Sequence, residues 1–347
     1  MSSFFQLSGI TPYTPGEQPR DKAYVKLNTN ESPFAPSPRV REALDADVLN
    51  RYPDPAAAAL TQALAEHYSV SAENVFVGNG SDEVLAFAFY AYGKRGISAP
   101  DLSYGFYPVF ADFFGLALKT IPLRADLSID PQDYCKQSQT VVFANPNAPT
   151  GLYLQPCEIR KIAAANPKRV VIVDEAYIDF GGQSAAGLTK ELGNLLVVGT
   201  FSKSRNLAGA RVGFAIGDAS LIADLNTLKF SFNPYNLSTL SIQAGVASLQ
   251  DAAYFEACTK EIIENRAWSA CELQRRGFTC TDSLANFLLA QSAKISGREL
   301  YLRLKEKGVL VRYLGNKRIE NCVRITIGTR EQMQTLFDKI DELCTEG

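Results

Sequence analysis

The sequence predicts an α/β fold in which a mostly parallel mixed sheet is sandwiched by helices, followed by a smaller α+β domain. Three observations predict it. At 347 residues the chain exceeds one ordinary hydrophobic core, so two domains are expected. From about residue 55, short apolar runs rich in β-branched residues alternate with helical patterns, which indicates βα units and a sheet buried on both faces. After residue 236 the order changes to helix, then strands, then helix, which is typical of an α+β domain.

The domain organisation follows from these patterns. Residues 1–40 are rich in Pro, Ser and Asn without a sustained period, so we expect an arm that crosses the surface, contributes to the small domain and makes dimer contacts. The large domain is expected at 41–240 and the small C-terminal domain at 241–347. The runs expected as strands of the large domain are NVFVG, ALKTIPL, TVVFANP, RVVIVDEA, NLLVVGT and RVGFAIG.

In the small domain we expect one long, largely helical stretch that ends near Arg276. The strand candidates that follow are FTCTDSLANFLLAQ, GVLVRYL and NCVRITIGT, and REQMQTLFDKIDELC forms a closing amphipathic helix.

Composition excludes several classes of function. The formal net charge is −2, so the chain has no global attraction to nucleic acid or to an anionic membrane. No apolar run approaches the roughly 20 residues of a bilayer span, and no secretory leader is recognisable. Seven cysteines without a CxxC pair indicate reduced thiols. We therefore expect a cytoplasmic protein with no membrane or nucleic-acid partner.

The only histidine, His67, lies in the helical pattern ALTQALAEHYSV, where a solitary imidazole is usually structural. A histidine-rich metal site and a Ser-His-Asp triad are both disfavoured, and we expect no metal.

Two segments suit an anionic group. The turn GNGSDE follows a strand and places Gly80, Ser81 and Asp82 at the start of a helix, where free backbone N–H groups favour a phosphate. The alternative for this segment alone is an ordinary N-cap. The stretch TFSKSRNLAGARVGF adds the hydroxyls of Thr200 and Ser202 and the guanidinium of Arg211, a set well matched to phosphate oxygens.

The same strand exits carry reactive groups. A lysine in such a cleft, here Lys203, has its pKa lowered by desolvation and neighbouring cations, so its amine can form an imine with an aldehyde. Asp174 ends a buried strand and requires a partner, for which a protonated ring nitrogen is suitable, although a structural N-cap is the alternative. Tyr177 follows three residues later and presents a phenol to the same cavity. Pyridoxal 5′-phosphate combines the aldehyde, the ring nitrogen and the phosphate in one molecule.

The ordered motifs NPNAPTG (145–151), DEAY (174–177) and TFSKSRNLAGARVGF (200–214) resemble the fold-type I pyridoxal-phosphate aminotransferases of the aspartate aminotransferase superfamily. Further stretches resemble the histidinol-phosphate aminotransferase family within it and cover the chain nearly end to end. These stretches are ITPYTPGE, KLNTNESPFAPSP, LNRYPDP, GNGSDE, PDLSYGFYPV, GVLVRYL and VRITIGTREQM.

The resemblance implies roles for the residues that hold the cofactor. Lys203 would be the Schiff-base lysine and proton carrier, Asp174 would pair with the pyridinium nitrogen, and Tyr177 would contact the phenolic oxygen. Tyr104 would stack on the ring, with a place in the hydrophobic core as its alternative. Tyr52, in RYPDP, would reach the phosphate bound by the neighbouring subunit, which implies a homodimer with shared active sites.

One position departs from the family pattern. The usual NPNNPTG has an asparagine before PTG that contacts the phenolic oxygen, whereas this chain has Ala148. Asn147 or a water would replace that contact, or Tyr177 would act alone. We retain Asn147 as a cofactor-binding candidate.

On the substrate side, the resemblance makes Arg324, Arg312 and Tyr13 contacts of a phosphate, with Asn30 at the mouth of the cavity. A solvated strand-edge charge is the alternative for Arg312, and ordinary loop structure is the alternative for Asn30. The implied reaction is a ping-pong transamination in histidine biosynthesis, from glutamate and imidazole-acetol phosphate to 2-oxoglutarate and L-histidinol phosphate.

Three other functions remain open at the level of sequence. Threonine-phosphate decarboxylases and aromatic amino-acid aminotransferases use nearly the same motifs. A non-catalytic pyridoxal-phosphate-binding regulator is more remote, because no basic helix-turn-helix extension precedes residue 40.

Overall fold

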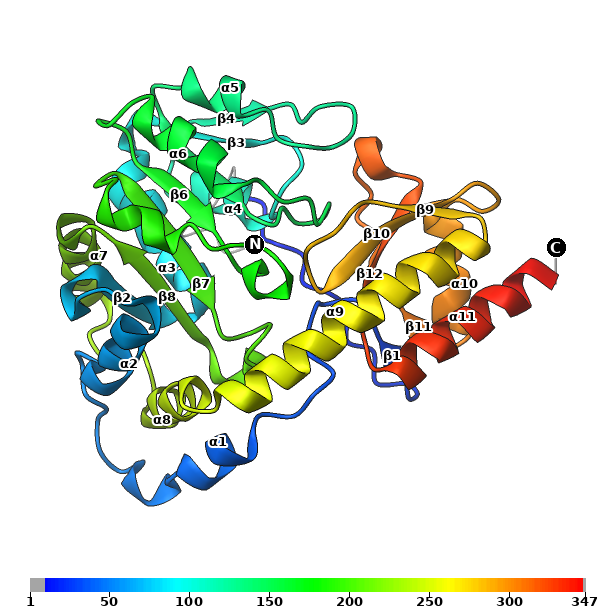
Figure 1. Ribbon diagram of the computed structural model, residues 1–347, viewed down its shortest axis with the longest axis horizontal. Helices are drawn as coiled ribbons and strands as arrows, with labels where there is room; N and C mark the ends of the chain where they lie inside the picture. Colours follow the sequence, from blue (N-terminus) through cyan, green and yellow to red (C-terminus); the bar gives the residue numbers. More distant parts are fainter. Residues whose placement is uncertain (1–9, 346–347) are drawn as a thin grey trace, which may run out of the picture.

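The computed structural model describes residues 10–345, and its larger part is built on a seven-stranded sheet (Figure 1). The strand order is β2-β8-β7-β6-β5-β3-β4, and all strands are parallel except β8, which is antiparallel to both β2 and β7. The predicted mostly parallel mixed sheet is confirmed. The strands are β2 (Val75–Asn79), β3 (Ile97–Pro100), β4 (Leu118–Ile121), β5 (Thr140–Ala144), β6 (Val171–Asp174), β7 (Leu195–Thr200) and β8 (Val212–Gly217).

Helices cover both faces of this sheet, because successive side chains of a strand point to opposite sides. On β7, Leu195 and Val197 join one hydrophobic core, whereas Leu196 and Val198 join the other. The helices of the first face are α1 (Pro38–Ala43), α2 (Ala58–Tyr68), α6 (Pro156–Ala164) and α8 (Thr239–Leu249). Those of the second face are α3 (Gly80–Tyr92), α4 (Phe106–Phe113) and α7 (Ala219–Phe232). The short helix α5 (Pro131–Cys135) packs on α6.

The C-terminal part has its own core and two small sheets, β12-β10-β9 and β1-β11 (Figure 1). The strands are β1 (Val25–Lys26), β9 (Phe278–Cys280), β10 (Phe287–Ser292), β11 (Val309–Leu310) and β12 (Cys322–Thr326). The helices are α9 (Ala252–Arg275), α10 (Gly297–Glu306) and α11 (Arg330–Thr345). The domain boundaries at residues 40 and 240 stay predictions.

The predicted long, largely helical stretch is confirmed and consists of α8 and α9. Asp251 lies between the two helices and accepts a hydrogen bond from the amide of Tyr254, so it caps the start of α9. One expectation was wrong, because a further helix, α10, lies between β10 and β11, where we expected strands alone.

The N-terminal arm does not simply cross the surface. Its strand β1 pairs in parallel with β11, and the next residues run into the interior, since Leu27, Asn28 and Asn30 are each only 1% exposed. This buried course brings the arm to the cavities described below.

Short 3-10 segments complete the described chain: Ala46–Val48, Ala72–Asn74, Gly93–Arg95, Ile178–Phe180, Ala186–Lys190, Ala208–Ala210 and Lys317–Ile319. None of the helices in residues 10–345 is both long and apolar enough to cross a membrane.

The carboxyl ends of the parallel strands meet at one edge of the large sheet. Asp174 is the last residue of β6, Thr200 is the last residue of β7, and Gly80 follows β2 directly. Because β8 is antiparallel, Arg211, which precedes it, lies at that same edge. This is the edge at which α/β sheets bind their ligands.

Candidate active site

Two adjoining cavities open at this edge. The inner cavity has a volume of about 90 Å³ and the outer cavity about 420 Å³. Both are lined by Tyr104, Ala148, Tyr177 and Lys203, so the lysine amine lies where the two spaces meet. The other residues that line the inner cavity are Ser81, Asp82, Ala144, Asp174, Ala176, Thr200, Ser202 and Arg211.

One end of the inner cavity carries hydrogen-bond donors. Helix α3 begins at Gly80 without a side-chain cap, and the amides of Ser81 and Asp82 lie in its first turn, where no intrahelical acceptor exists. Gly80 has a φ of +74°, and a Cβ at this position would collide with the guanidinium of Arg211. Glycine is therefore required for the turn and for the position of Arg211.

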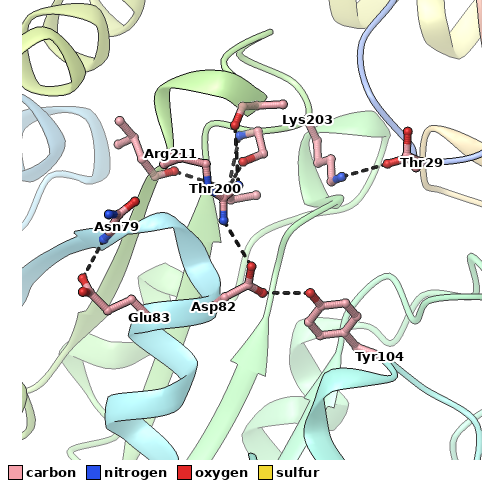
Figure 2. Close-up of polar contacts among 11 residues, drawn as sticks. Thr29, Asn79, Asp82, Glu83, Tyr104, Thr200, Lys203 and Arg211 are labelled. Atoms are coloured by element: carbon pink, nitrogen blue, oxygen red, sulfur yellow. Dashed lines mark hydrogen bonds and ion pairs between the residues drawn. The ribbon is translucent and has the colours of Figure 1, made fainter. Parts of the chain in front are cut away.

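The charged groups at this end are paired with one another. The Arg211 guanidinium donates to Asp82 at 3.1 Å, and the Tyr104 hydroxyl donates to the same carboxylate at 2.8 Å. Figure 2 shows the Asp82 carboxylate between these two side chains. Tyr104 is thus held by Asp82 at the junction of the two cavities.

The carboxylate of Asp174 lies at the buried end of β6. It accepts hydrogen bonds from the Tyr107 hydroxyl at 3.1 Å and from the amide of Ala176 at 3.2 Å. Burial raises the pKa of Asp174 from 3.8 to about 6, against the opposing effect of these hydrogen bonds. The group is therefore mostly ionised at neutral pH and no cation among the described residues is hydrogen-bonded to it. Tyr107 was missed from sequence because its apolar surroundings resemble any core helix.

The amine of Lys203 is partly buried and donates to the backbone carbonyl of Thr29 at 3.2 Å, as Figure 2 shows. Desolvation, reinforced by the nearby Arg324 and Arg211 charges, lowers the pKa of Lys203 from 10.5 to about 8. At pH 7 about one amine in ten is then neutral and nucleophilic, far more than for an ordinary lysine.

The arm segment Asn28–Asn30 contacts three of the predicted site residues in turn. The carbonyl of Asn28 accepts from Arg324 at 3.0 Å, that of Thr29 accepts from Lys203, and the Asn30 amide donates to the Tyr177 hydroxyl at 3.0 Å. Asn28 and Thr29 were missed, since they act largely through backbone carbonyls, which leave no signature in a sequence.

The outer cavity contains two arginines on paired backbone segments. Arg312 and Arg324 lie opposite each other and exchange backbone hydrogen bonds at 2.8 and 2.9 Å. The Arg312 guanidinium donates to the carbonyls of Thr14 and Pro15, and Arg324 lies over the ring of Phe287. Like charges in this arrangement repel each other, so the site favours an anion.

Arg324 and Asn28 line this cavity, and each has a buried polar atom without a hydrogen-bond partner among the described residues, namely Nε of Arg324 and Oδ1 of Asn28. Tyr13 and Asn30 also line the outer cavity. Asn30 is deeply buried, however, and does not lie at the mouth.

Three residues singled out from sequence lie outside both cavities. The Asn147 amide donates to the Leu102 carbonyl at 3.0 Å and its oxygen accepts from Ser103, so it is not directed at the site. Tyr52 is 82% exposed and stacks on Tyr235. His67 packs against Tyr68 and Arg205, in keeping with a structural place.

Comparison with known proteins identifies relatives over nearly the whole chain. Residues 22–340 match the family model "Aminotransferase class I and II". The histidinol-phosphate aminotransferase of Brachyspira hyodysenteriae is 47% identical over 98% of each chain, and that of Clostridium botulinum strain 657 is 45% identical over 97% of each.

Among solved structures, the fold is similar to the histidinol-phosphate aminotransferase of Sinorhizobium meliloti in complex with pyridoxal-5′-phosphate. The TM-score is 0.85, with 24% identity over 93% of this chain and 92% of that one. The identities of 47% and 45% to the curated relatives extend over nearly the whole length of both chains. The chain therefore belongs to the class I and II aminotransferases and, within them, to the histidinol-phosphate aminotransferase family.

Proposed function

We propose that this chain uses pyridoxal 5′-phosphate to transfer the amino group of glutamate to imidazole-acetol phosphate, giving 2-oxoglutarate and L-histidinol phosphate in histidine biosynthesis. The observation that carries the proposal is the Arg312–Arg324 pair in a cavity that adjoins the Lys203 amine. The inner cavity offers an imine-forming amine, and the outer cavity offers two guanidiniums for a phosphorylated substrate.

The inner cavity fits the cofactor at both ends. The first-turn amides of α3, the hydroxyls of Thr200 and Ser202 and the Arg211 guanidinium match a phosphate. At the buried end, the ionised Asp174 lacks a cationic hydrogen-bond partner within the described chain, which suits a protonated ring nitrogen. Cofactor atoms between these groups would lie against Tyr104 and Tyr177.

When bound, pyridoxal 5′-phosphate supplies an aldehyde that carries the amino group and a ring that accepts the electron pair left when the substrate Cα loses its proton. Lys203 would hold that aldehyde through Nζ and, once released, would move the proton from the substrate Cα. Asp174 would keep a proton on the ring nitrogen, and Tyr177 would donate to the phenolic oxygen. Arg312 and Arg324 would bind and orient the substrate anion.

Assays that offer different acceptors with glutamate as donor, read by 2-oxoglutarate release, test this function. Hydrogen bonds to charged groups contribute about 1.5–3 kcal/mol each, so kcat/KM for imidazole-acetol phosphate should exceed that for phenylpyruvate by about 100-fold or more. Replacing Arg312 by Gln should reduce this preference at least tenfold. Equal use of phenylpyruvate would favour an aromatic aminotransferase, and carbon dioxide release from threonine phosphate would favour the decarboxylase.

We also propose that two copies of the chain form a homodimer. Four exposed aromatic side chains lie around the end of α7 and the segment near residue 52. They are Tyr52, Phe230, Phe232 and Tyr235, which are 82%, 53%, 80% and 43% exposed. Tyr52 stacks on Tyr235 at 4.6 Å between ring centroids, so this aromatic patch is continuous at least in part. Exposed groups of large apolar side chains are typical of protein interfaces.

Replacing Phe232 by Asp should weaken this dimer at least tenfold, because a carboxylate would be buried in an apolar contact. Sedimentation equilibrium measures the dissociation constant. Leu302→Asp provides a matched control, since Leu302 is 41% exposed on α10, away from the aromatic patch. A dimer unaffected by Phe232→Asp would place the interface elsewhere.

A further inference from the structure

We propose that Asn30 is a positioning residue that directs the hydroxyl proton of Tyr177 into the inner cavity, toward the phenolic oxygen of the cofactor. This inference rests on the proposed function and deepens it. Asn30 acts through Tyr177, because its side-chain amide donates a hydrogen bond to the hydroxyl oxygen of that residue.

The direction of each hydrogen bond follows from a short chain of contacts. The backbone amide of Asn30 donates to Oγ1 of Thr326 at 3.0 Å, which occupies that oxygen as an acceptor. The Thr326 hydroxyl then donates to Oδ1 of Asn30, also at 3.0 Å. This fixes the amide so that Nδ2 faces Tyr177 and donates to its hydroxyl oxygen at 3.0 Å. Since that oxygen accepts from Asn30, the phenol proton is free for another acceptor.

The surroundings hold this chain rigidly. Asn30 has a φ of 55°, a left-handed conformation that asparagine tolerates better than most residues. Its carbonyl accepts from the side chain of Asn286 at 3.0 Å, and both residues are at most 1% exposed. The Tyr177 ring is 8% exposed and meets Phe287 edge-on at 5.1 Å. Neither side chain can readily adopt another orientation.

The lining of the inner cavity explains why the direction of the Tyr177 hydroxyl proton matters. Three residues that line the inner cavity together with Tyr177, namely Ala144, Ala148 and Ala176, have side chains that cannot donate a hydrogen bond. The nearby amide of Asn147 is engaged by the Leu102 carbonyl. Tyr177 also lines both cavities, so its hydroxyl is placed to serve a group held at their junction.

The test measures the pH midpoint of the change in the visible absorption band of the cofactor-loaded protein. This spectroscopic readout is independent of turnover. A hydrogen bond to the phenolic oxygen stabilises its anionic form and lowers this midpoint. Asn30→Gly removes the amide while permitting the left-handed backbone. We expect the midpoint to rise by about one pH unit, a tenfold change in proton affinity. Circular dichroism and thermal unfolding of the same samples check the fold.

A double-mutant cycle separates an effect of Asn30 on the Tyr177 hydroxyl from a general disturbance of the site. In a Tyr177→Phe background, Asn30→Gly should leave the midpoint unchanged, because the hydroxyl on which Asn30 acts is already absent. Thr326→Val removes the hydroxyl that orients the Asn30 amide and should raise the midpoint by a smaller amount. Thr326→Ser keeps this hydroxyl and should restore the native value. The Thr326 pair also tests the inference if Asn30→Gly fails to fold.

An unchanged midpoint in Asn30→Gly would overturn the inference, and so would an equal rise in the presence and absence of the Tyr177 hydroxyl. Equal midpoints in Thr326→Val and Thr326→Ser would also contradict it. Failure of the proposed function has a different signature, since the native chain would then form no visible band with pyridoxal 5′-phosphate.

Discussion

Replacing Lys203 by Ala should abolish transamination, with kcat falling by at least about 10³-fold. In the proposed mechanism the variant loses the amine that moves the proton at the substrate Cα, and a positioned acid–base group alone contributes about 10²–10⁴-fold. It would also lose the proposed covalent bond to the cofactor. A single-turnover experiment with glutamate, followed by absorbance, measures the effect without the second half-reaction.

Lys203→Arg separates charge from nucleophilicity. The guanidinium keeps the positive charge near Thr29 but cannot form the imine, so this variant should be as inactive as Lys203→Ala. Added methylamine should partly restore proton transfer in Lys203→Ala and leave Lys203→Arg unchanged, because only the first leaves room for it. Activity within tenfold of the native chain in either variant would exclude Lys203 as the proton carrier.

Asp174→Asn should lower kcat/KM by about 10³-fold, equivalent to about 4 kcal/mol in the transition state. The amide keeps the shape of the carboxylate but cannot hold a proton on the ring nitrogen, so the ring accepts electrons less readily. Steady-state kinetics with glutamate and imidazole-acetol phosphate measure this loss.

The cofactor-free Asp174→Asn protein should be at least as stable as the native chain. The pKa of Asp174 is raised to about 6 in the folded state from 3.8, so its ionisation costs stability as pH rises through that interval. At neutral pH the substitution removes a cost of up to about 3 kcal/mol, offset by weaker hydrogen bonds to Tyr107 and Ala176. A large fall in unfolding temperature without cofactor would mean that Asp174 is chiefly structural.

Sequence patterns predicted most of the large sheet but not all of it. The six apolar runs are strands because continuous branched side chains suit a sheet buried on both faces. Strand β3 was missed, since ISAP has a single β-branched residue and is held by β4 and β5 on either side. Strand β8 runs in the reverse direction because its connection to β7 is short. The eleven residues between the two strands contain only a short 3-10 segment, and a parallel crossover needs a longer connection.

The candidate site was predictable where its chemistry lies in side chains at strand ends. Lys203, Asp174 and Arg211 follow from that rule, and the structure brings them to one edge of the sheet. The contacts that the arm makes through the backbone carbonyls of Asn28 and Thr29 were not predictable, because backbone carbonyls have no residue preference. The contact between Asn30 and Tyr177 joins positions 147 residues apart, and only the tertiary fold brings them together.

The central claim is that the Lys203 amine binds the aldehyde of pyridoxal 5′-phosphate. Borohydride reduction of the cofactor-loaded native protein, followed by mass spectrometry of its peptides, tests it directly. The predicted result is one phosphopyridoxyl group on Lys203 and none on Lys229, a lysine that is also withdrawn from solvent, at 1% exposed, but donates to the Pro55 carbonyl away from the site. A colourless protein with no adduct on Lys203, or with the adduct on another lysine, would contradict the account.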